Sequence, residues 1–145
     1  MKYKIRFLLA LLFIMSLPAS ADSISSQASK FWVEFRNAVK SEDYQALETM
    51  TRFPLAVHGE LDFMPVKKIE KEGFAGAFKK LLNQEIYIDK NGQEIRTTMR
   101  NVVIETVQID KKYNLDRDKH FRVSDLEFDY KDNRWALFRT YYPEE

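Results

Sequence analysis

The sequence predicts an α+β fold in which N-terminal helices pack on one face of a strongly bent antiparallel sheet. Apolar residues recur at steps of three and four over residues 24–40, which is the period of one helix face. From Glu85 onward the period changes to two, which is typical of strands. Helices that come first and strands that follow them form the α+β pattern.

Residues 1–21 are predicted to be a cleaved secretory signal peptide. A basic start is followed by an apolar run over 7–17, a break at Pro18 and small residues that end at Ala21. This order is typical of signal peptides, and the run is shorter than the roughly 20 residues of a membrane-spanning helix. We therefore expect cleavage after Ala21, a periplasmic or secreted bacterial protein without a stable membrane anchor, and a single α+β domain over 22–145.

The charge and the cysteine content exclude several classes of function. Of 23 basic and 22 acidic residues, the predicted leader carries three basic ones and no acidic one, so the rest of the chain is close to neutral. This balance, without a basic block, argues against nucleic acid as a partner. The chain has no cysteine, which excludes disulfides, thiol catalysis and a lipid-modified cysteine.

The N-terminal half of the domain predicts two helices in succession. The first covers 24–40, and its apolar face consists of Ile24, Ala28, Phe31, Trp32, Phe35, Ala38 and Val39. Ser41 is the expected N-cap of the second, because a serine hydroxyl accepts well from a free backbone N–H. This helix must end near Met50 or Thr51, since Pro54 forces the residue before it into an extended conformation.

Short extended pieces and a third helix follow. Leu55 to Val57 predicts a strand that ends in a turn at Gly59, and Phe63 to Val66 predicts a second extended piece. A helix is expected over 67–83, with a break or kink near Gly73, or a close backbone approach there, because glycine weakens a helix interior.

The C-terminal half predicts antiparallel strands. Asn91-Gly92 marks a hairpin turn between two alternating runs. We expect a long strand over 101–110, a polar loop over 113–119, and two more strands over 120–130 and 135–142.

One stretch of the sequence resembles a known superfamily. Residues 31–47 are similar to the first two helices of the nuclear transport factor 2-like superfamily, with Asp43 opening the second helix and Leu47 four residues later. The resemblance implies a cystatin-like α+β cone. The superfamily includes ketosteroid isomerases, dehydratases, binders of small ligands and many members without known activity.

The same resemblance argues against isomerase chemistry in this chain. Isomerases of this type use a tyrosine late in the first helix to stabilise an oxyanion, and an aspartate base after the second helix. Those positions fall on Phe35 and Gly59 here, with Glu60 beside the latter. Phenylalanine has no hydroxyl to donate, so the group that would stabilise the oxyanion is missing.

No metal or cofactor is expected. His58 and His120 are far apart in the sequence, and neither has a second ligand at helical or hairpin spacing. Asp125, Glu127 and Asp129 alternate along one predicted strand, but the glycine and glutamate of a calcium loop are absent. We expect a solvated sheet face whose acids pair with Arg122, Arg134 or Arg139 across strands.

The candidate lining of a ligand pocket is a set of polar and aromatic side chains: Phe35, Arg52, His58, Glu60, Arg100, Glu105, Arg139 and Tyr141. Two roles are open for Arg52. In the first, the segment only ends the second helix and turns the chain, so that Phe53 lies in the core and Arg52 is exposed. Alternatively, Arg52 lies at the mouth of the cone and faces an acidic group.

Three functions follow from these observations. The first is an exported, non-enzymatic domain that binds a small molecule or a protein. The second is an isomerase, dehydratase or hydrolase that uses His58 with Glu60 or Glu105 as an acid–base pair. The third is an interaction, inhibitor or immunity module that works through the open face of its sheet, which could equally serve a homodimer.

Overall fold

The computed structural model describes residues 24–59, 61, 63–110 and 119–141, and it has an α+β fold. The elements, in chain order, are α1 (Ile24–Ser41), α2 (Tyr44–Thr49), β1 (Thr51–His58), β2 (Lys67–Ile69), the 3₁₀ turn η1 (Lys71–Gly73), α3 (Phe74–Leu82), β3 (Glu85–Lys90), β4 (Gln93–Thr98), α4 (Met99–Glu105), β5 (His120–Val123), β6 (Leu126–Lys131) and β7 (Arg134–Tyr141). The predicted leader, Glu60 and nearly all of the predicted loop 113–119 lie outside the described residues.

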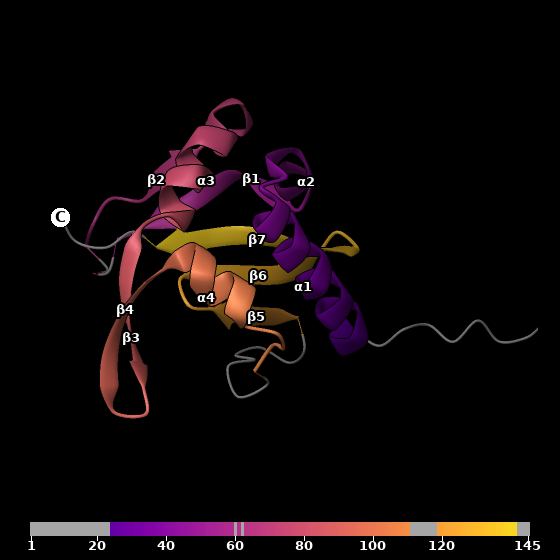
Figure 1. Cartoon of the computed structure of the whole chain (residues 1–145). Helices are drawn as coiled ribbons and strands as arrows, with labels where there is room; N and C mark the ends of the chain where they lie inside the picture. Colours follow the sequence, from indigo (N-terminus) through magenta and orange to yellow (C-terminus); the bar gives the residue numbers. More distant parts are fainter. Residues whose placement is uncertain (1–23, 60, 62, 111–118, 142–145) are drawn as a thin grey trace, which may run out of the picture.

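Five strands form one mixed sheet in the order β2-β1-β7-β6-β5, and α1 and α4 lie across β5, β6 and β7 (Figure 1). The expected purely antiparallel sheet is wrong, because β1 and β7 run parallel while the other neighbours are antiparallel. The expected strong bend is also wrong, since the sheet is not strongly curled. Strands β3 and β4 form a separate two-stranded sheet.

The core lies between the helices and one face of this sheet, and its centre is aromatic. Trp32 and Phe35 of α1 are at most 1% exposed, as the helical period predicted. The ring of Phe35 packs edge-on against Phe128 of β6 at a centroid distance of 5.0 Å, and Phe121 of β5 stacks on Phe128 at 4.6 Å. Each of the helices α1 to α4 buries residues in this same cluster.

The second helix begins later than expected. Its N-cap is Asp43, whose Oδ1 accepts from the N–H of Ala46 at 2.9 Å, so the expected cap at Ser41 is wrong. Ser41 is the last residue of α1, and its hydroxyl donates to the carbonyl of Asn37. Glu42 has a positive φ of 55°, which separates the two helices. The predicted end near Met50 is confirmed.

Strand β1 contains the predicted strand and extends beyond it. Leu55 and Val57 are buried on the core side, so the alternating Arg52 and His58 lie on the other face. Pro54 falls where the pairing with β7 shifts register, as expected for a residue that cannot donate to the ladder.

The region after β1 is partly mispredicted. Residues 63–66 form no strand; the strand is β2, and its Ile69 lies opposite Leu55 of β1. A helix over 67–83 is therefore wrong at its start, because the buried face begins only at Phe74. The expected break at Gly73 is confirmed, since η1 ends there.

The strand expected over 101–110 is wrong, because residues 101–105 belong to α4 and residues 106–110 form no strand. In α4, Met99 and Val103 are buried four residues apart, and the side chain of Thr98 accepts from the N–H of Asn101 as the N-cap. The β-branched run from Val102 to Ile104 favours a strand locally, but packing against α1 decides the conformation.

The C-terminal hairpins follow their turn residues. The strand expected over 120–130 is two strands, which reverse at Ser124 with a φ of 48°. Asp132 and Asn133 both have positive φ between β6 and β7, and the predicted Asn91-Gly92 turn between β3 and β4 is confirmed in the same way. The β3–β4 hairpin projects away from the rest of the molecule (Figure 1).

Candidate functional site

The face of the five-stranded sheet turned away from the core, called the outer face below, carries a connected group of charged and aromatic side chains. Since α1 to α4 all pack into the core cluster, no helix of the described part covers this face. Its members are Arg52 and His58 of β1, His120 and Arg122 of β5, Glu127 and Asp129 of β6, and Phe138, Arg139 and Tyr141 of β7.

Glu127 lies at the centre of this group and is only 6% exposed. The phenol of Tyr141 donates to its Oε1 at 2.6 Å, and Nε2 of His120 lies 3.2 Å from its Oε2. The guanidinium groups of Arg139 and Arg122 lie 3.6 and 3.8 Å from the carboxylate. The strand register explains these contacts, because Glu127 pairs with Arg122 on one side and with Arg139 on the other.

These contacts keep the Glu127 carboxylate ionised. Burial by itself would raise its pKa, but the hydrogen bonds from Tyr141 and His120 and the charge of Arg139 outweigh burial, so the pKa lies below its ordinary value. The pKa of Tyr141 is raised, first by burial and then by its hydrogen bond to Glu127. Burial also raises the pKa of Asp125 in the β5–β6 turn, against the lowering effect of Arg122.

Further contacts extend the group across the outer face. Arg52 forms an ion pair with Asp129, in which both side chains are about one quarter exposed. The guanidinium of Arg122 lies 4.7 Å from the centre of the Tyr141 ring, and the His58 ring lies 5.9 Å from the same ring. Four strands thus contribute to one continuous polar and aromatic surface.

Two guanidinium donors and one imidazole nitrogen on this surface are left without a hydrogen-bond partner among the described residues. They are Nη2 of Arg52, Nδ1 of His120 and Nε of Arg139, and all three atoms are buried. His120 and Arg139 also line an open hollow of about 500 Å³, together with Lys119, Glu127, Asp129, Tyr130, Lys131 and Phe138. Because buried donors normally have a partner, the nitrogens of Arg52 and Arg139 favour a ligand that brings acceptor atoms.

The structure brings four of the candidate pocket residues together and separates the others. Arg52, His58, Arg139 and Tyr141 all belong to the outer face. Phe35 is fully buried in the aromatic core. The remaining three do not join this surface: Arg100 and Glu105 lie on α4, at the core side of the sheet, and Glu60 lies outside the described residues.

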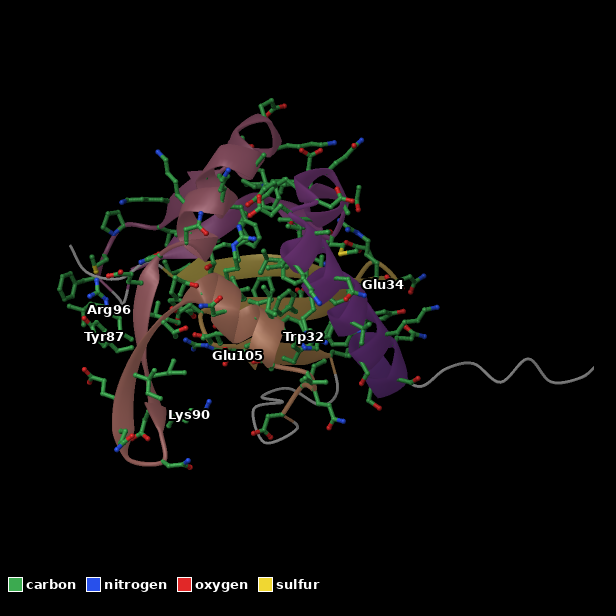
Figure 2. The ribbon with its side chains drawn as sticks, in the orientation of Figure 1. Trp32, Glu34, Tyr87, Lys90, Arg96 and Glu105 are labelled. Carbon is green, nitrogen blue, oxygen red and sulfur yellow. The ribbon has the colours of Figure 1, made fainter. Side chains whose placement is uncertain are left out.

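Arg100 has a structural role. Its guanidinium donates to the carbonyl of Val39 at 3.0 Å and to the hydroxyl of Tyr44 at 2.9 Å, and it lies 3.3 Å from the carboxylate of Glu42. It therefore ties α4 to the junction of α1 and α2. Glu105 is exposed at the end of α4 (Figure 2), so it cannot act with His58, which is on the opposite side of the sheet.

The expectation for the acidic series was correct in its partners and wrong in its environment. Arg122 and Arg139 do pair with these acids, whereas Arg134 donates to the carbonyl of Thr49. Glu127 is not solvated as expected, because side chains from β5 and β7 enclose it. The alternation of arginines with acids in the sequence indicated the ion pairs. It did not indicate that Glu127 is buried.

In the part of the chain that the structure describes, no group of three or more acidic or histidine side chains could hold a metal ion. None of the described helices is both long and apolar enough to span a membrane.

No family model matches the chain, and no curated protein shows significant similarity to its sequence.

Proposed function

We propose that this protein is a non-enzymatic binding domain that recognises a carboxylate-bearing partner on the outer face of its five-stranded sheet. The observation that carries this proposal is the buried Glu127 network, in which Arg139, with an unpartnered Nε donor, lines an open hollow. A ligand site needs a few placed polar groups beside apolar surface, and the ring of Phe138 supplies apolar surface here.

The filling of the interior favours the outer face over the centre of the fold. A ligand inside the domain would have to occupy the space between α1 and the sheet. That space holds the rings of Trp32, Phe35, Phe121 and Phe128, each at most 1% exposed. Close-packed cores of this kind leave no room for a ligand.

The charges around the hollow favour an anion. Its acids already have partners in the protein, since Glu127 binds Tyr141 and His120 while Asp129 binds Arg52. Lys119, Lys131 and Arg139 also line the hollow. A carboxylate fits this arrangement because it accepts several charge-assisted hydrogen bonds, and planar guanidinium groups bind it well.

Glu127 acts in this proposal as an acceptor that fixes the positions of its neighbours. The lowered pKa keeps it ionised near neutral pH, which is unsuitable for a general acid. Its negative charge holds His120, Arg139 and Tyr141 in place, and two of these, His120 and Arg139, line the hollow.

Two broader expectations belong to the same proposal. Membership of the nuclear transport factor 2-like superfamily is supported by the order of two helices, a strand, a helix and later strands, while the modest curvature of the sheet speaks against a cone. Export is supported by the pattern of residues 1–21. Mass measurement of protein recovered from a bacterial periplasm tests export, and a chain that begins at Asp22 is the expected result.

Calorimetric titration tests the binding proposal. Succinate and a short acidic peptide are the probes, and they separate a small-molecule source of the carboxylate from a protein source. Arg139→Met should weaken binding of the recognised probe about tenfold, which corresponds to the loss of a charge-assisted hydrogen bond. Arg96→Met is the matched control, because Arg96 also pairs with a glutamate but lies on the β3–β4 hairpin (Figure 2). Equal loss in both variants, or no binding of either probe, would contradict the proposal.

A further inference from the structure

The β3–β4 hairpin is an arm with two open edges. It is a separate two-stranded sheet whose six residue pairs run without a break from Glu85↔Thr98 to Lys90↔Gln93. It extends away from the body of the molecule (Figures 1 and 2). Tyr87 is 63% exposed and Ile95 is 36% exposed. Because a hairpin by itself is marginally stable in water, this arm is a candidate for completion by further strands.

The edge of β4 has few of the features that normally prevent strands from pairing. Edge strands are protected by charged side chains, above all lysine, and by proline, a bulge or very short length; the charges of β4, Glu94 and Arg96, are of opposite sign. The edge strand β2 of the main sheet has two of these, since it is three residues long and contains Lys67 and Lys68. Strand β4 has six residues, Gln93–Thr98, and has no lysine, proline or register shift.

The hydrogen-bond pattern leaves β4 with free groups at regular intervals. In a hairpin with a two-residue turn, the pair that closes the turn is hydrogen-bonded, and the pairs then alternate. The closing pair is Lys90↔Gln93, so the backbone groups of Glu94 and Arg96 point away from β3. Among the described residues, no other strand pairs with that side of β4.

The side chains of β4 are complementary to a second copy in one register. A two-fold axis normal to a sheet places one residue opposite its own copy. With the axis at Ile95, Glu94 of each chain lies opposite Arg96 of the other, and these are the two residues with free backbone groups. An axis at Glu94 or Arg96 would instead place like charges opposite each other, which is unfavourable.

Strand β3 offers no equivalent register. With the axis at Tyr87, Glu85 lies opposite Asp89 of the other copy, which places like charges together. With the axis at Ile88, Ile86 lies opposite Lys90, which places an apolar residue against a charged one. Only β4 combines opposite charges, an apolar centre and a free edge.

We propose that β4 pairs antiparallel with β4 of a second copy of this chain, about a two-fold axis at Ile95. The two hairpins then form one four-stranded sheet. Ile88 and Ile95 share one face of each hairpin, so dimerisation brings four isoleucines together on that face. Arg96 also binds Glu85 of its own hairpin, and its several donors allow it to bind Glu94 of the other copy as well. This surface is separate from the outer face and does not depend on its function.

Charge reversal tests this pairing by sedimentation of the full chain, purified after expression with its own N-terminal segment. Glu94→Arg places arginine opposite Arg96, and Arg96→Glu places glutamate opposite Glu94, so each variant should weaken self-association about tenfold. A mixture of the two variants restores opposite charges at both contacts and should associate like the wild type. Glu34→Arg on the exposed side of α1 is the matched control (Figure 2). A wild type that stays monomeric at all concentrations, or a mixture no better than either variant, overturns the proposal.

Cross-linking gives a second test that does not depend on charge. The chain has no cysteine, so Ile95→Cys introduces a single thiol that would lie directly opposite its copy, within the range of a disulfide. Mild oxidation should convert most of this variant to a covalent dimer. Tyr87→Cys is the control, because Tyr87 is more exposed but its two copies would be about 16 Å apart, across three strand spacings and offset by two residues along the strands. Faster dimer formation by the Tyr87 variant would overturn the proposed register.

Discussion

Tyr141 donates a hydrogen bond of 2.6 Å to the carboxylate of Glu127, and the two residues shift each other's pKa in opposite directions. The bond joins β7 to β6 on the outer face, where no described helix covers the sheet. It requires a protonated phenol and an ionised carboxylate at the same time. The free energy of unfolding therefore depends on the protonation of two residues of the proposed binding surface.

The pH dependence of stability should reveal this pair. The pKa of Glu127 is lowered from 4.5, so its contribution to the free energy of unfolding is complete above that value and is lost as the pH falls through the folded-state pKa. The pKa of Tyr141 is raised from 10.0, so its contribution is lost as the pH rises through the folded-state value. Denaturant unfolding of wild type and Glu127→Gln should differ by about 2 kcal/mol at neutral pH. The difference should shrink at acid pH, and a difference that is constant with pH would contradict this prediction.

A polar group placed in the aromatic core should be costly. Phe35→Tyr introduces a hydroxyl beside the rings of Phe78 and Phe128, which offer no hydrogen-bond acceptor. We expect a loss of about 2 kcal/mol of stability, because an unsatisfied buried donor forfeits its hydration. Thermal and denaturant unfolding measure the loss. Unchanged stability would indicate space or water at this site, and would revive the possibility of an interior pocket.

Arg100 should matter for stability and not for binding. Arg100→Met removes the contacts that join α4 to Val39, Tyr44 and Glu42, and we expect a loss of about 2 kcal/mol. Affinity for the carboxylate probe should remain unchanged under conditions where the variant is folded. A selective loss of affinity would move the binding site to the helical side of the sheet.

Two glycines should respond to alanine with opposite signs. Gly76 lies within α3 with nothing within 4 Å of an added Cβ, so Gly76→Ala should stabilise the protein by about 1 kcal/mol. At Gly59 an added Cβ would lie 2.6 Å from Cβ of Met64, so Gly59→Ala should destabilise it by about 2 kcal/mol through overpacking. Paired denaturant curves measure both changes, and the same sign for both would contradict the packing described here.

Local patterns predicted those parts of the fold that depend on neighbouring residues. The spacing of Trp32, Phe35 and Val39 predicted the buried face of α1, and Asn91-Gly92 predicted the β3–β4 turn. The same reasoning failed for α4, since the β-branched Val102 and Val103 favour a strand and packing against α1 favours a helix.

Features that depend on distant residues were not predictable in this way. The parallel pairing of Thr51 with Leu137 joins the two ends of the domain, and no local pattern encodes it. Glu127 appeared as one of three alternating acids, and its burial arises only when β5 and β7 place His120, Arg139 and Tyr141 around it. The candidate site therefore emerged from the assembled sheet, although Arg139 and Tyr141 were already among the expected residues.

The most direct test of the binding proposal is an NMR titration of the ¹⁵N-labelled protein with the acidic peptide and with succinate. Binding on the outer face predicts saturable shifts confined to that face, at His120, Arg122, Glu127 and Arg139, while the amides of α1 around Phe35 stay unchanged. Shifts centred on α1 and α4, or shifts that never saturate on the outer face, would contradict the central claim that this protein binds its partner on the open sheet.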